Sequence, residues 1–420
     1  MPIVMKDVTV ETRIEDHITE EILRRHLADA SSEKMIYVIT PNEVELLREY
    51  SPSLYHHIAK TFGYSNNDEH KDARLAFQVQ SVLVNKFSTL DASIIQGKRD
   101  VGTVESKVHS YRRLLRLLQV LGITGYTDVS DDLLAQNNLE AILVDVKLKT
   151  ASLFADLPIW AQEVPLVTKT AKLSAQDVQK FSYIDRLREL CGRENVVGIM
   201  VYGSSARATK KHSDYDNFVV LKKGTLKDMY NRVGYDKRTE KDILHTDGKP
   251  ISMQLIEEDV FPKYIRLCHD PRQHLLHGLV IYGTVQLPDV SAAEGIERGV
   301  SHALLRLRTL KTGASNVMGE PEMFASKPNL FEYMTKTPRF ILESALNARD
   351  GIRYRSKEEI EDALKSRGIH VFAYKNDIEH AQKAILHAAI GGTNLVEEYF
   401  KGRRFDTTLV QYKPACLGVA

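Results

Sequence analysis

The sequence predicts an α+β protein, in which a small mixed sheet is flanked by a mainly helical N-terminal region and a C-terminal helical bundle. Three observations lead to this fold class. Apolar residues recur at helical spacing through much of residues 1–160. Short apolar runs that are typical of buried strands fall between residues 196 and 283. Beyond residue 291, several segments open on a helix-capping residue and are joined by short connections.

The length and composition are those of a folded protein with more than one domain. A chain of 420 residues is long enough for two or three domains, each with its own core. Hydrophobic residues at 43% and charged residues at 27% are ordinary globular values, so long disorder is not expected. We expect domains at residues 1–160, 166–290 and 291–420, because Pro158 and Pro165 are too close to allow a helix between the first two.

Charge and cysteine usage exclude several classes of protein. The 57 Lys and Arg residues nearly balance the 56 Asp and Glu residues, whereas proteins that track long nucleic acids are more often clearly basic. The three cysteines are sparse and far apart, which argues against a disulfide framework and favours a reducing cytoplasm. Neither a signal peptide nor an apolar run of membrane-spanning length is evident, so no membrane partner is expected.

The N-terminal region is expected to begin with a helix and to include one strand. Its first helical face is formed by Ile14, Ile18, Ile22 and Leu27. The run 35–39 could be a strand, and Thr40–Glu43 has the residues of a helix start, namely a hydroxyl cap, a proline and a glutamate three residues after the cap.

A further helix is expected over residues 103–121, and it carries many basic residues. Its apolar side consists of Val104, Val108, Tyr111, Leu115 and Leu118. Its basic residues are Lys107, His109, Arg112, Arg113 and Arg116. A solvated face on an ordinary core helix is the favoured interpretation, and contact with a phosphate backbone is the alternative.

The stretch around residues 196–221 has the clearest chemical pattern in the chain. The apolar run 196–202 reads as a buried strand, and it leads into a tight turn at Gly203 and Ser204, where backbone N–H groups could face an anion. A second apolar run opens on Asp214 and Asp216. If this run is a strand, both carboxylates project from the same face.

Two carboxylates on one face are costly unless a positive charge lies between them. The usual occupant is a hard divalent cation, and Mg²⁺ accepts one or two carboxylates together with substrate phosphates. A phosphate-binding turn beside such a pair is the equipment of phosphoryl or nucleotidyl transfer. A chance surface turn is the less favoured alternative, because the strand, turn, linker and carboxylates must occur in this order.

Gly203-Ser204, followed after nine residues by Asp214-x-Asp216, resembles the signature of the DNA-polymerase-β-like nucleotidyltransferase superfamily, in particular its minimal nucleotidyltransferase branch. The resemblance covers residues 196–221 and extends less firmly over 174–290. It implies that Asp214 and Asp216 are catalytic and hold Mg²⁺ or Mn²⁺. It also implies a nucleoside triphosphate substrate, for which we expect ATP. The residues expected to bind the nucleotide are Gly203, Ser204, Arg207 and Ser213.

The chain departs from the family pattern at the third carboxylate. In the family a later strand brings a further acid beside the pair, and the matching position in the expected strand 250–256 is Gln254. An amide oxygen ligates weakly and is no base at neutral pH. Either Glu257 or Glu258 supplies the acid from a shifted position, or the protein is a weak or inactive enzyme.

Other elements are expected on both sides of this stretch. Ser174–Asp177 caps a helix that ends near Gly192, and residues 277–283 form a closing strand. The apolar face of the helix that residues 174–177 cap is formed by Val178, Phe181, Ile184, Leu187 and Leu190. Cys268, His274 and His277 are compatible with zinc, although a solvated loop leading into a helix is favoured.

Three capped helices are expected in the C-terminal bundle. The first follows Ser291, the second follows Ser356 and stops at Gly368, and the third follows Asp377 and ends at Gly391-Gly392. Their apolar faces are Val300, Leu304, Leu307 and Leu310 in the first, Ile360, Ala363 and Leu364 in the second, and Ile378, Ala381, Ile385 and Ala388 in the third.

The leading hypothesis is a metal-dependent enzyme that moves a nucleoside monophosphate to an acceptor hydroxyl and releases pyrophosphate. Gln254 is the main support for a rival, a nucleotide-binding regulator or scaffold without activity. The basic helix at 103–121 weakly suggests a third, an RNA-end nucleotidyltransferase. The acceptor stays open between a small molecule, a protein and RNA, because all three are compatible with the same nucleotide half-site.

Overall fold

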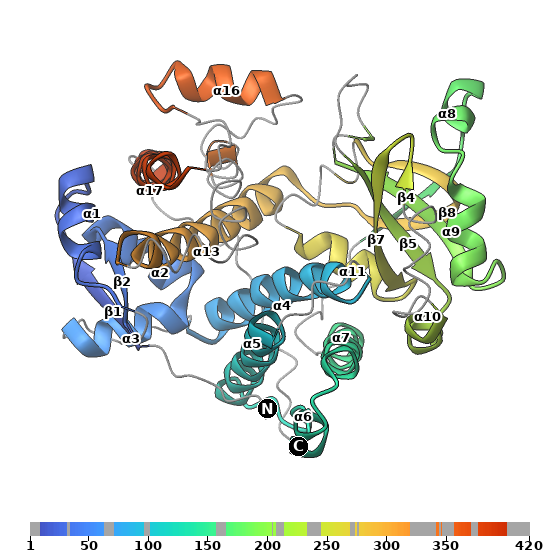
Figure 1. Ribbon diagram of the computed structural model, residues 1–420, viewed down its shortest axis with the longest axis horizontal. Helices are drawn as coiled ribbons and strands as arrows, with labels where there is room; N and C mark the ends of the chain where they lie inside the picture. Colours follow the sequence, from blue (N-terminus) through green and yellow to red (C-terminus); the bar gives the residue numbers. More distant parts are fainter. Residues whose placement is uncertain are drawn as a thin grey trace. The chain divides into compact units, whose positions relative to one another are not determined.

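A computed structural model confirms the predicted α+β fold class. It has a six-stranded mixed sheet and helical regions at both ends (Figure 1). The segment 66–70, the segment around Trp160 and the tail after residue 401 lie outside the described residues. The structure describes residues 9–31, 34–62, 71–95, 101–156, 165–203, 205–206, 214–232, 245–268, 274, 277–319, 342–343, 346, 357–370 and 377–400.

Contacts along the backbone group the chain into two compact units. One unit is built on Val79–Ser291 and the other on Lys6–Gln78 together with Ala292–Tyr412. The first unit contains the six-stranded sheet. The three domains expected from the sequence stay a prediction.

The sheet of the first unit has the strand order β3-β8-β4-β5-β7-β6. Neighbouring strands are antiparallel except for β5 and β7, which are parallel. The strands expected at 196–202, in the run that opens on Asp214 and Asp216, and at 250–256 are therefore all present and are neighbours in the sheet. The strand β3 was missed because its short sequence lacks an apolar run. The strands are β3 (Leu166–Thr170), β4 (Val196–Tyr202), β5 (Tyr215–Leu221), β6 (His245–Thr246), β7 (Lys249–Glu257) and β8 (Leu279–Pro288).

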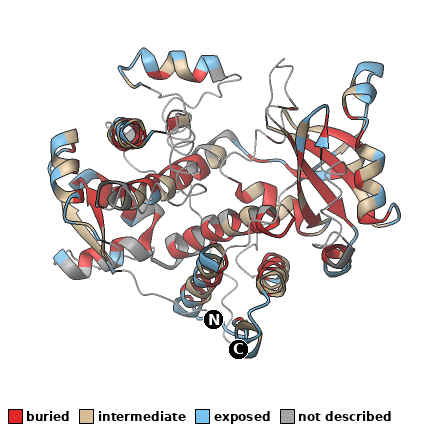
Figure 2. Ribbon diagram, in the orientation of Figure 1, coloured by how far each residue is buried: buried red, intermediate tan, exposed pale blue. Residues whose placement is uncertain are grey.

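Helices cover both faces of this sheet. Figure 1 shows α9 (Ile184–Cys191) and α11 (Phe261–Leu267) on opposite sides of the strands. On the α9 side, the Tyr183 hydroxyl donates to Asn217 of β5. On the α11 side, Tyr264 packs against Phe218 of the same strand. The central strands are consequently buried, as their almost continuous apolar sequences predict (Figure 2).

The helix expected after Ser174 begins as predicted but is interrupted. The Ser174 hydroxyl and the Asp177 carboxylate form a reciprocal capping box at the start of α8 (Ala175–Lys180). A turn then separates α8 from α9, and Val178, expected on the buried face, is 58% exposed. The prediction of one continuous apolar face was wrong because Phe181 packs from the turn instead of from a helix.

A helical layer adjoins the β7 side of the sheet. It contains α4 (Lys71–Ile95, which continues into the other unit), α5 (Val101–Val120), α6 (Asp131–Ala135), α7 (Leu139–Asp156) and α10 (Leu226–Arg232). Asp91 of α4 joins this layer to the sheet. Its carboxylate accepts hydrogen bonds from Lys147 Nζ at 2.7 Å and from the backbone N–H of Leu255 at 3.2 Å, and also from the Tyr230 hydroxyl.

The second unit contains a parallel pair of strands, of which the sequence predicted only the second. The strands β1 (Thr9–Ile14) and β2 (Lys34–Ile39) are joined by α1 (Glu20–Leu27). The strand expected at 35–39 is confirmed. The helical face expected from Ile14 to Leu27 was wrong, because Ile14 ends a strand and Ile18 lies in the connection before α1.

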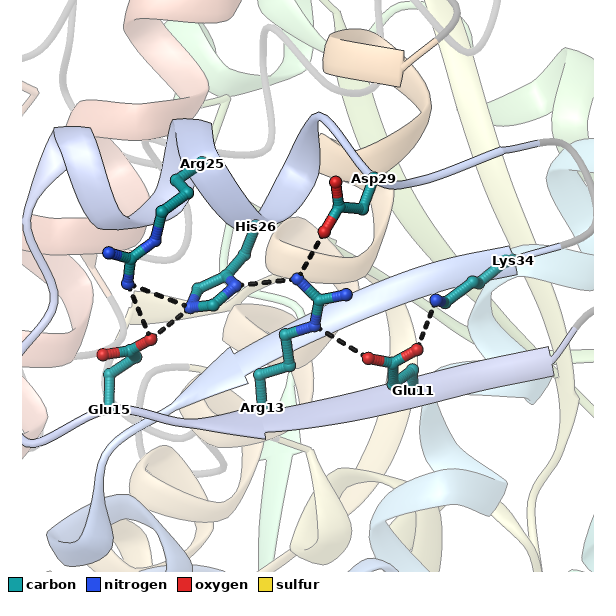
Figure 3. A network of polar contacts seen from close by, with 7 residues as sticks. All are labelled: Glu11, Arg13, Glu15, Arg25, His26, Asp29 and Lys34. Carbon is teal, nitrogen blue, oxygen red and sulfur yellow. Dashed lines mark hydrogen bonds and ion pairs between the residues drawn. The ribbon is translucent and has the colours of Figure 1, made fainter.

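A network of polar contacts ties β1 to α1 (Figure 3). At its centre, the Arg13 guanidinium donates to Glu11 and to Asp29, each at 2.8 Å. It also lies 2.8 Å from His26 Nδ1. His26 Nε2 in turn contacts the Glu15 carboxylate and lies 3.4 Å from Arg25 Nη2. The complete network consists of Glu11, Arg13, Glu15, Arg25, His26, Asp29 and Lys34.

The helix start predicted at Thr40 is confirmed, but the role of Glu43 differs. The Thr40 hydroxyl accepts a hydrogen bond from Glu43 N–H at the start of α2 (Pro41–Tyr50), which precedes α3 (Pro52–Phe62). The Glu43 side chain is buried instead of returning to the cap. It pairs with Lys311 Nζ at 2.6 Å and accepts from the Tyr37 hydroxyl at 2.7 Å.

The C-terminal helices are confirmed, with one correction. The first two, α13 (Ala292–Gly319) and α16 (Lys357–Lys365), bury Val300, Leu304 and Ile360 as expected. The third, α17 (Ile378–Phe400), does not end at Gly391-Gly392. A side chain at Gly391 would come within 2.9 Å of Ile369, so this glycine permits close packing and does not stop the helix. No helix among the described residues is long and apolar enough to cross a lipid bilayer.

Candidate functional site

The register of three neighbouring strands places Asp216 and Gln254 on one face of the sheet. Asp216 of β5 lies opposite Tyr202 of β4 and opposite Ser252 of β7. Two residues further along, Phe218 lies opposite Gln254. Because side chains of paired residues project to the same side and alternate along each strand, all five belong to one face.

The turn after β4 brings the backbone of Gly203 against the carboxylate of Asp216. Gly203 has φ +70°, a conformation that glycine adopts readily and other residues rarely. A Cβ atom at this position would lie 2.9 Å from Asp216 Oδ2. The tight turn expected at Gly203 is therefore present, and only a residue without a side chain allows this close approach.

The surroundings of Asp216 that the structure describes disfavour its ionised form. Burial and, to a lesser extent, the negative charge of nearby Asp214 together raise its pKa to about 7. Asp214 lies just before β5 and is half-buried. The two carboxylates expected to act together are thus close enough to repel each other, and a bound cation would relieve both the burial and the repulsion.

The donor set fits Mg²⁺ or Mn²⁺ that shares its coordination with a ligand. Two carboxylates with oxygens from water and a phosphate group are the ligands that Mg²⁺ commonly takes in proteins. Over the described residues, no group of three or more His, Cys, Asp or Glu side chains is arranged to hold a metal. The residues that could hold the ion are Asp214 and Asp216.

Gln254 lies on the same face as Asp216, but its amide is already engaged. Its Nε2 donates to the Tyr202 hydroxyl oxygen at 3.0 Å, and its Oε1 accepts from the Tyr264 hydroxyl at 3.1 Å. The direct neighbour of Asp216 on β7 is Ser252. The amide therefore bridges two tyrosines instead of supplying a ligand or a base.

Neither glutamate considered as a replacement acid can reach the site. Glu257 lies opposite Leu221, five residues along β5 from Asp216, which is about 16 Å at 3.3 Å per residue. It also projects to the other face, and its carboxylate accepts from the backbone N–H of Leu226 at 2.9 Å. Glu258 lies beyond the end of β7, where it accepts from the N–H of Lys223 at 3.4 Å.

Sequence reasoning missed the aromatic side chains beneath the carboxylates. The Tyr202 ring stacks on Phe218 with 4.2 Å between ring centroids. Phe218 also packs against Phe261 and Tyr264 of α11. The position of Tyr202, directly before the Gly203 turn, was a usable signal, whereas the contact with Tyr264 depends on how α11 returns to the sheet.

The opposite face of β5 is held by a buried asparagine that was also missed. Asn217 is fully buried and accepts from the Tyr183 hydroxyl at 3.0 Å. Its amide donates to the Tyr215 carbonyl at 2.9 Å and to the Ser252 carbonyl at 3.1 Å. This side chain ties β5 to β7 beside Asp216. Its polar character within an apolar run was the available signal.

Lysine side chains lie near the turn. Lys180 Nζ donates to the Ser205 carbonyl at 2.7 Å, and the Ser205 hydroxyl donates to the Tyr202 carbonyl at 3.1 Å. Burial lowers the pKa of Lys180, and the positive charge of Lys249 lowers it as well. The turn is therefore held on the α8 side by a cationic side chain.

Several expected contacts cannot be placed. Ser204, Arg207 and Ser213, which the resemblance assigns to the nucleotide, lie outside the described residues. The basic residues 210–212 also lie there. Gly203, Asp214 and Asp216 are the predicted site residues that the structure brings together.

The segment 268–277 and the basic helix α5 were two further candidate sites. Cys268 and His274 are buried, whereas residues 269–273 and 275–276 of the segment expected to be solvated lie outside the described residues. The zinc alternative gains no ligand cluster among the described residues. On α5, Arg112 pairs with Asp128 at 2.7 Å and Lys107 donates to Thr89 at 2.5 Å. These contacts favour an ordinary core helix over a phosphate-binding one.

Compared with known proteins, the chain matches no family model, no curated protein and no solved structure. The resemblance to nucleotidyltransferases therefore depends on the residues of this chain and on their arrangement.

Proposed function

We propose that this protein is a metal-dependent nucleotidyltransferase, with its site at the turn after β4 and the start of β5. The observation that carries the proposal is the position of Asp216. Its carboxylate lies half-buried against the backbone of Gly203 and beside Asp214. A strand, a glycine turn and two carboxylates at the start of the next strand would together provide the phosphate and cation sites that nucleotidyl transfer requires.

In the proposed reaction, an acceptor hydroxyl oxygen forms a bond to the α-phosphorus of a nucleoside triphosphate, for which we expect ATP. The bond from that phosphorus to the bridging oxygen breaks, and pyrophosphate leaves with the electron pair while the hydroxyl proton passes to solvent. Asp214 and Asp216 would hold Mg²⁺ or Mn²⁺, which supplies charge stabilisation to the reacting oxygens. Gly203 and Ser204 would bind the phosphates, and Arg207 and Ser213 would contribute further contacts.

Gln254 supports the second candidate, a nucleotide-binding regulator or scaffold without transfer activity. Its amide bridges Tyr202 and Tyr264, and both glutamates that could have replaced the missing acid lie away from Asp216. A positioned general base typically contributes about 10²–10⁴-fold, so its loss would leave a slow enzyme or none. An RNA-end transferase is less favoured, because two basic residues of α5 are engaged within the protein.

A transfer assay separates these candidates. Each of four α-labelled nucleoside triphosphates is incubated with Mg²⁺, the protein and a lysate, and the label is followed into protein, RNA and small molecules. If the protein is an active enzyme, we expect metal-dependent transfer that the double substitution Asp214→Asn with Asp216→Asn abolishes. The matched control is Asp228→Asn, on the exposed side of α10, which should retain transfer. Nucleotide binding without transfer into any fraction would favour the regulator.

A further inference from the structure

Gln254 is the middle member of a hydrogen-bonded chain that ends near Asp216. The Tyr264 hydroxyl, on α11, donates to Gln254 Oε1 at 3.1 Å. The Gln254 Nε2 amide then donates to the Tyr202 hydroxyl oxygen at 3.0 Å. The Tyr202 ring is held in place because it stacks on Phe218. The chain therefore runs in one direction, from α11 across β7 to the side chain of β4.

This direction determines what the Tyr202 hydroxyl can do. Its oxygen accepts a hydrogen bond from Gln254, so its own proton is left to donate elsewhere. Across the part of the chain that the structure describes, Tyr202 has no acceptor for that proton. After burial, the negative charge of Asp216 is the largest cause of the raised pKa of Tyr202. In the antiparallel register of β4 and β5, Tyr202 lies directly opposite Asp216, so its side chain projects from the same face as the Asp216 carboxylate.

We propose that Tyr202 donates a hydrogen bond to an anionic oxygen at the Asp216 end of the site, and that Gln254 is the positioning residue that sets the direction of this donor. The inference rests on the proposed nucleotide site. Asp216 does not accept this proton in the structure, so the acceptor in the bound state is a phosphate oxygen of the nucleotide or a carboxylate oxygen of Asp216 that turns on metal binding. Both take the same kind of charge-assisted hydrogen bond.

An amide at position 254 is required for this arrangement, whereas a carboxylate would reverse it. In Gln254→Glu, the ionised side chain can only accept, so it would draw the protons of both Tyr202 and Tyr264 toward itself. In Gln254→Met, the chain is cut, but the Tyr202 proton stays available. The two substitutions therefore separate the direction of the hydrogen bond from its presence.

Ligand binding by the full chain tests the proposal without reference to turnover. Calorimetric titrations use Mg²⁺ alone and Mg²⁺ with α,β-methylene-ATP. We expect Tyr202→Phe and Gln254→Glu each to weaken binding by about tenfold, the factor that about 1.4 kcal/mol represents. Gln254→Met should have a smaller effect. Because Gln254 acts through the Tyr202 hydroxyl, adding Gln254→Glu to Tyr202→Phe should cause no further loss.

The titrations also identify the acceptor. Tyr202→Phe weakens binding of Mg²⁺ alone if Asp216 accepts the hydrogen bond, and weakens only nucleotide binding if a phosphate oxygen does. Should Gln254→Glu fail to fold, the same cycle is run with Tyr264→Phe and Tyr202→Phe, neither of which introduces a charge.

Losses that add in the double variant would overturn the inference, as would equal losses from Gln254→Glu and Gln254→Met. If these results accompany normal wild-type binding, the proposed nucleotide site still stands and only the inference fails. Wild-type protein that binds neither Mg²⁺ nor the nucleotide analogue would overturn both.

Discussion

Substituting Gly203 by alanine tests whether the turn after β4 forms part of the site. The structure predicts two separate penalties. The first is the positive φ of 70°, which costs a residue with a side chain about 1–2 kcal/mol of folding free energy. The second is the added Cβ, which would lie 2.9 Å from Asp216 Oδ2, so that the carboxylate must move.

Gly224 provides a matched control for the first penalty. Its φ is +81°, and no atom lies within 4 Å of the position that a Cβ would occupy. Gly224→Ala should therefore show the loss of stability in urea unfolding that positive φ alone causes, and Gly203→Ala should lose at least as much, with any excess due to the displaced Asp216 carboxylate. Only Gly203→Ala should also lose affinity for Mg²⁺ with ATP, by more than about tenfold in calorimetric titration. Unchanged affinity in Gly203→Ala would refute the assignment of this turn to the phosphates.

Three further predictions concern buried polar groups. Asn217→Ala should cost about 1–3 kcal/mol in urea unfolding, because it leaves the buried Tyr183 hydroxyl without its acceptor. Lys147→Met should cost about 3–5 kcal/mol, because it leaves the Asp91 carboxylate buried without its cation. Asp91→Leu added to it should recover only part of the loss, because the Tyr230 hydroxyl and the Leu255 N–H then lack their acceptor. The pKa of Asp216 is raised from 3.8 to about 7 in the folded protein, so between these pH values the folded state keeps a proton on Asp216 that the unfolded state has lost. Metal-free wild type should therefore lose stability between about pH 4 and pH 7, and unfolding curves of Asp216→Asn should lack this contribution.

Local patterns in the sequence predicted the elements that carry the site. The apolar runs of β4, β5 and β7 are buried, and strands of this composition need little information from elsewhere in the chain. The caps at Thr40 and Ser174 are formed by residues three positions apart, so their geometry is local as well. The spacing of Asp214 and Asp216 placed both carboxylates close together for the same reason.

The interactions that were missed join residues far apart in the chain. Gln254 could be recognised as a departure, but its bond to Tyr202 spans 52 residues and depends on the parallel register of β5 and β7. A shift of one residue would have turned its side chain to the other face. Asp91 reaches the backbone of Leu255 across 164 residues. β1 was read as helical because a partly exposed strand shows no clear alternation, and its partner β2 begins only after α1.

The binding of Mn²⁺ is the most direct test of whether Asp214 and Asp216 hold a metal ion. The EPR signal of free Mn²⁺ falls when the ion is bound, so a titration in the presence of ATP measures the site without requiring an acceptor. We expect wild-type protein to take up Mn²⁺ together with ATP. The double substitution Asp214→Asn with Asp216→Asn should remove this uptake, whereas Asp228→Asn should retain it. Full uptake by the double variant would contradict the claim that these two carboxylates hold the metal.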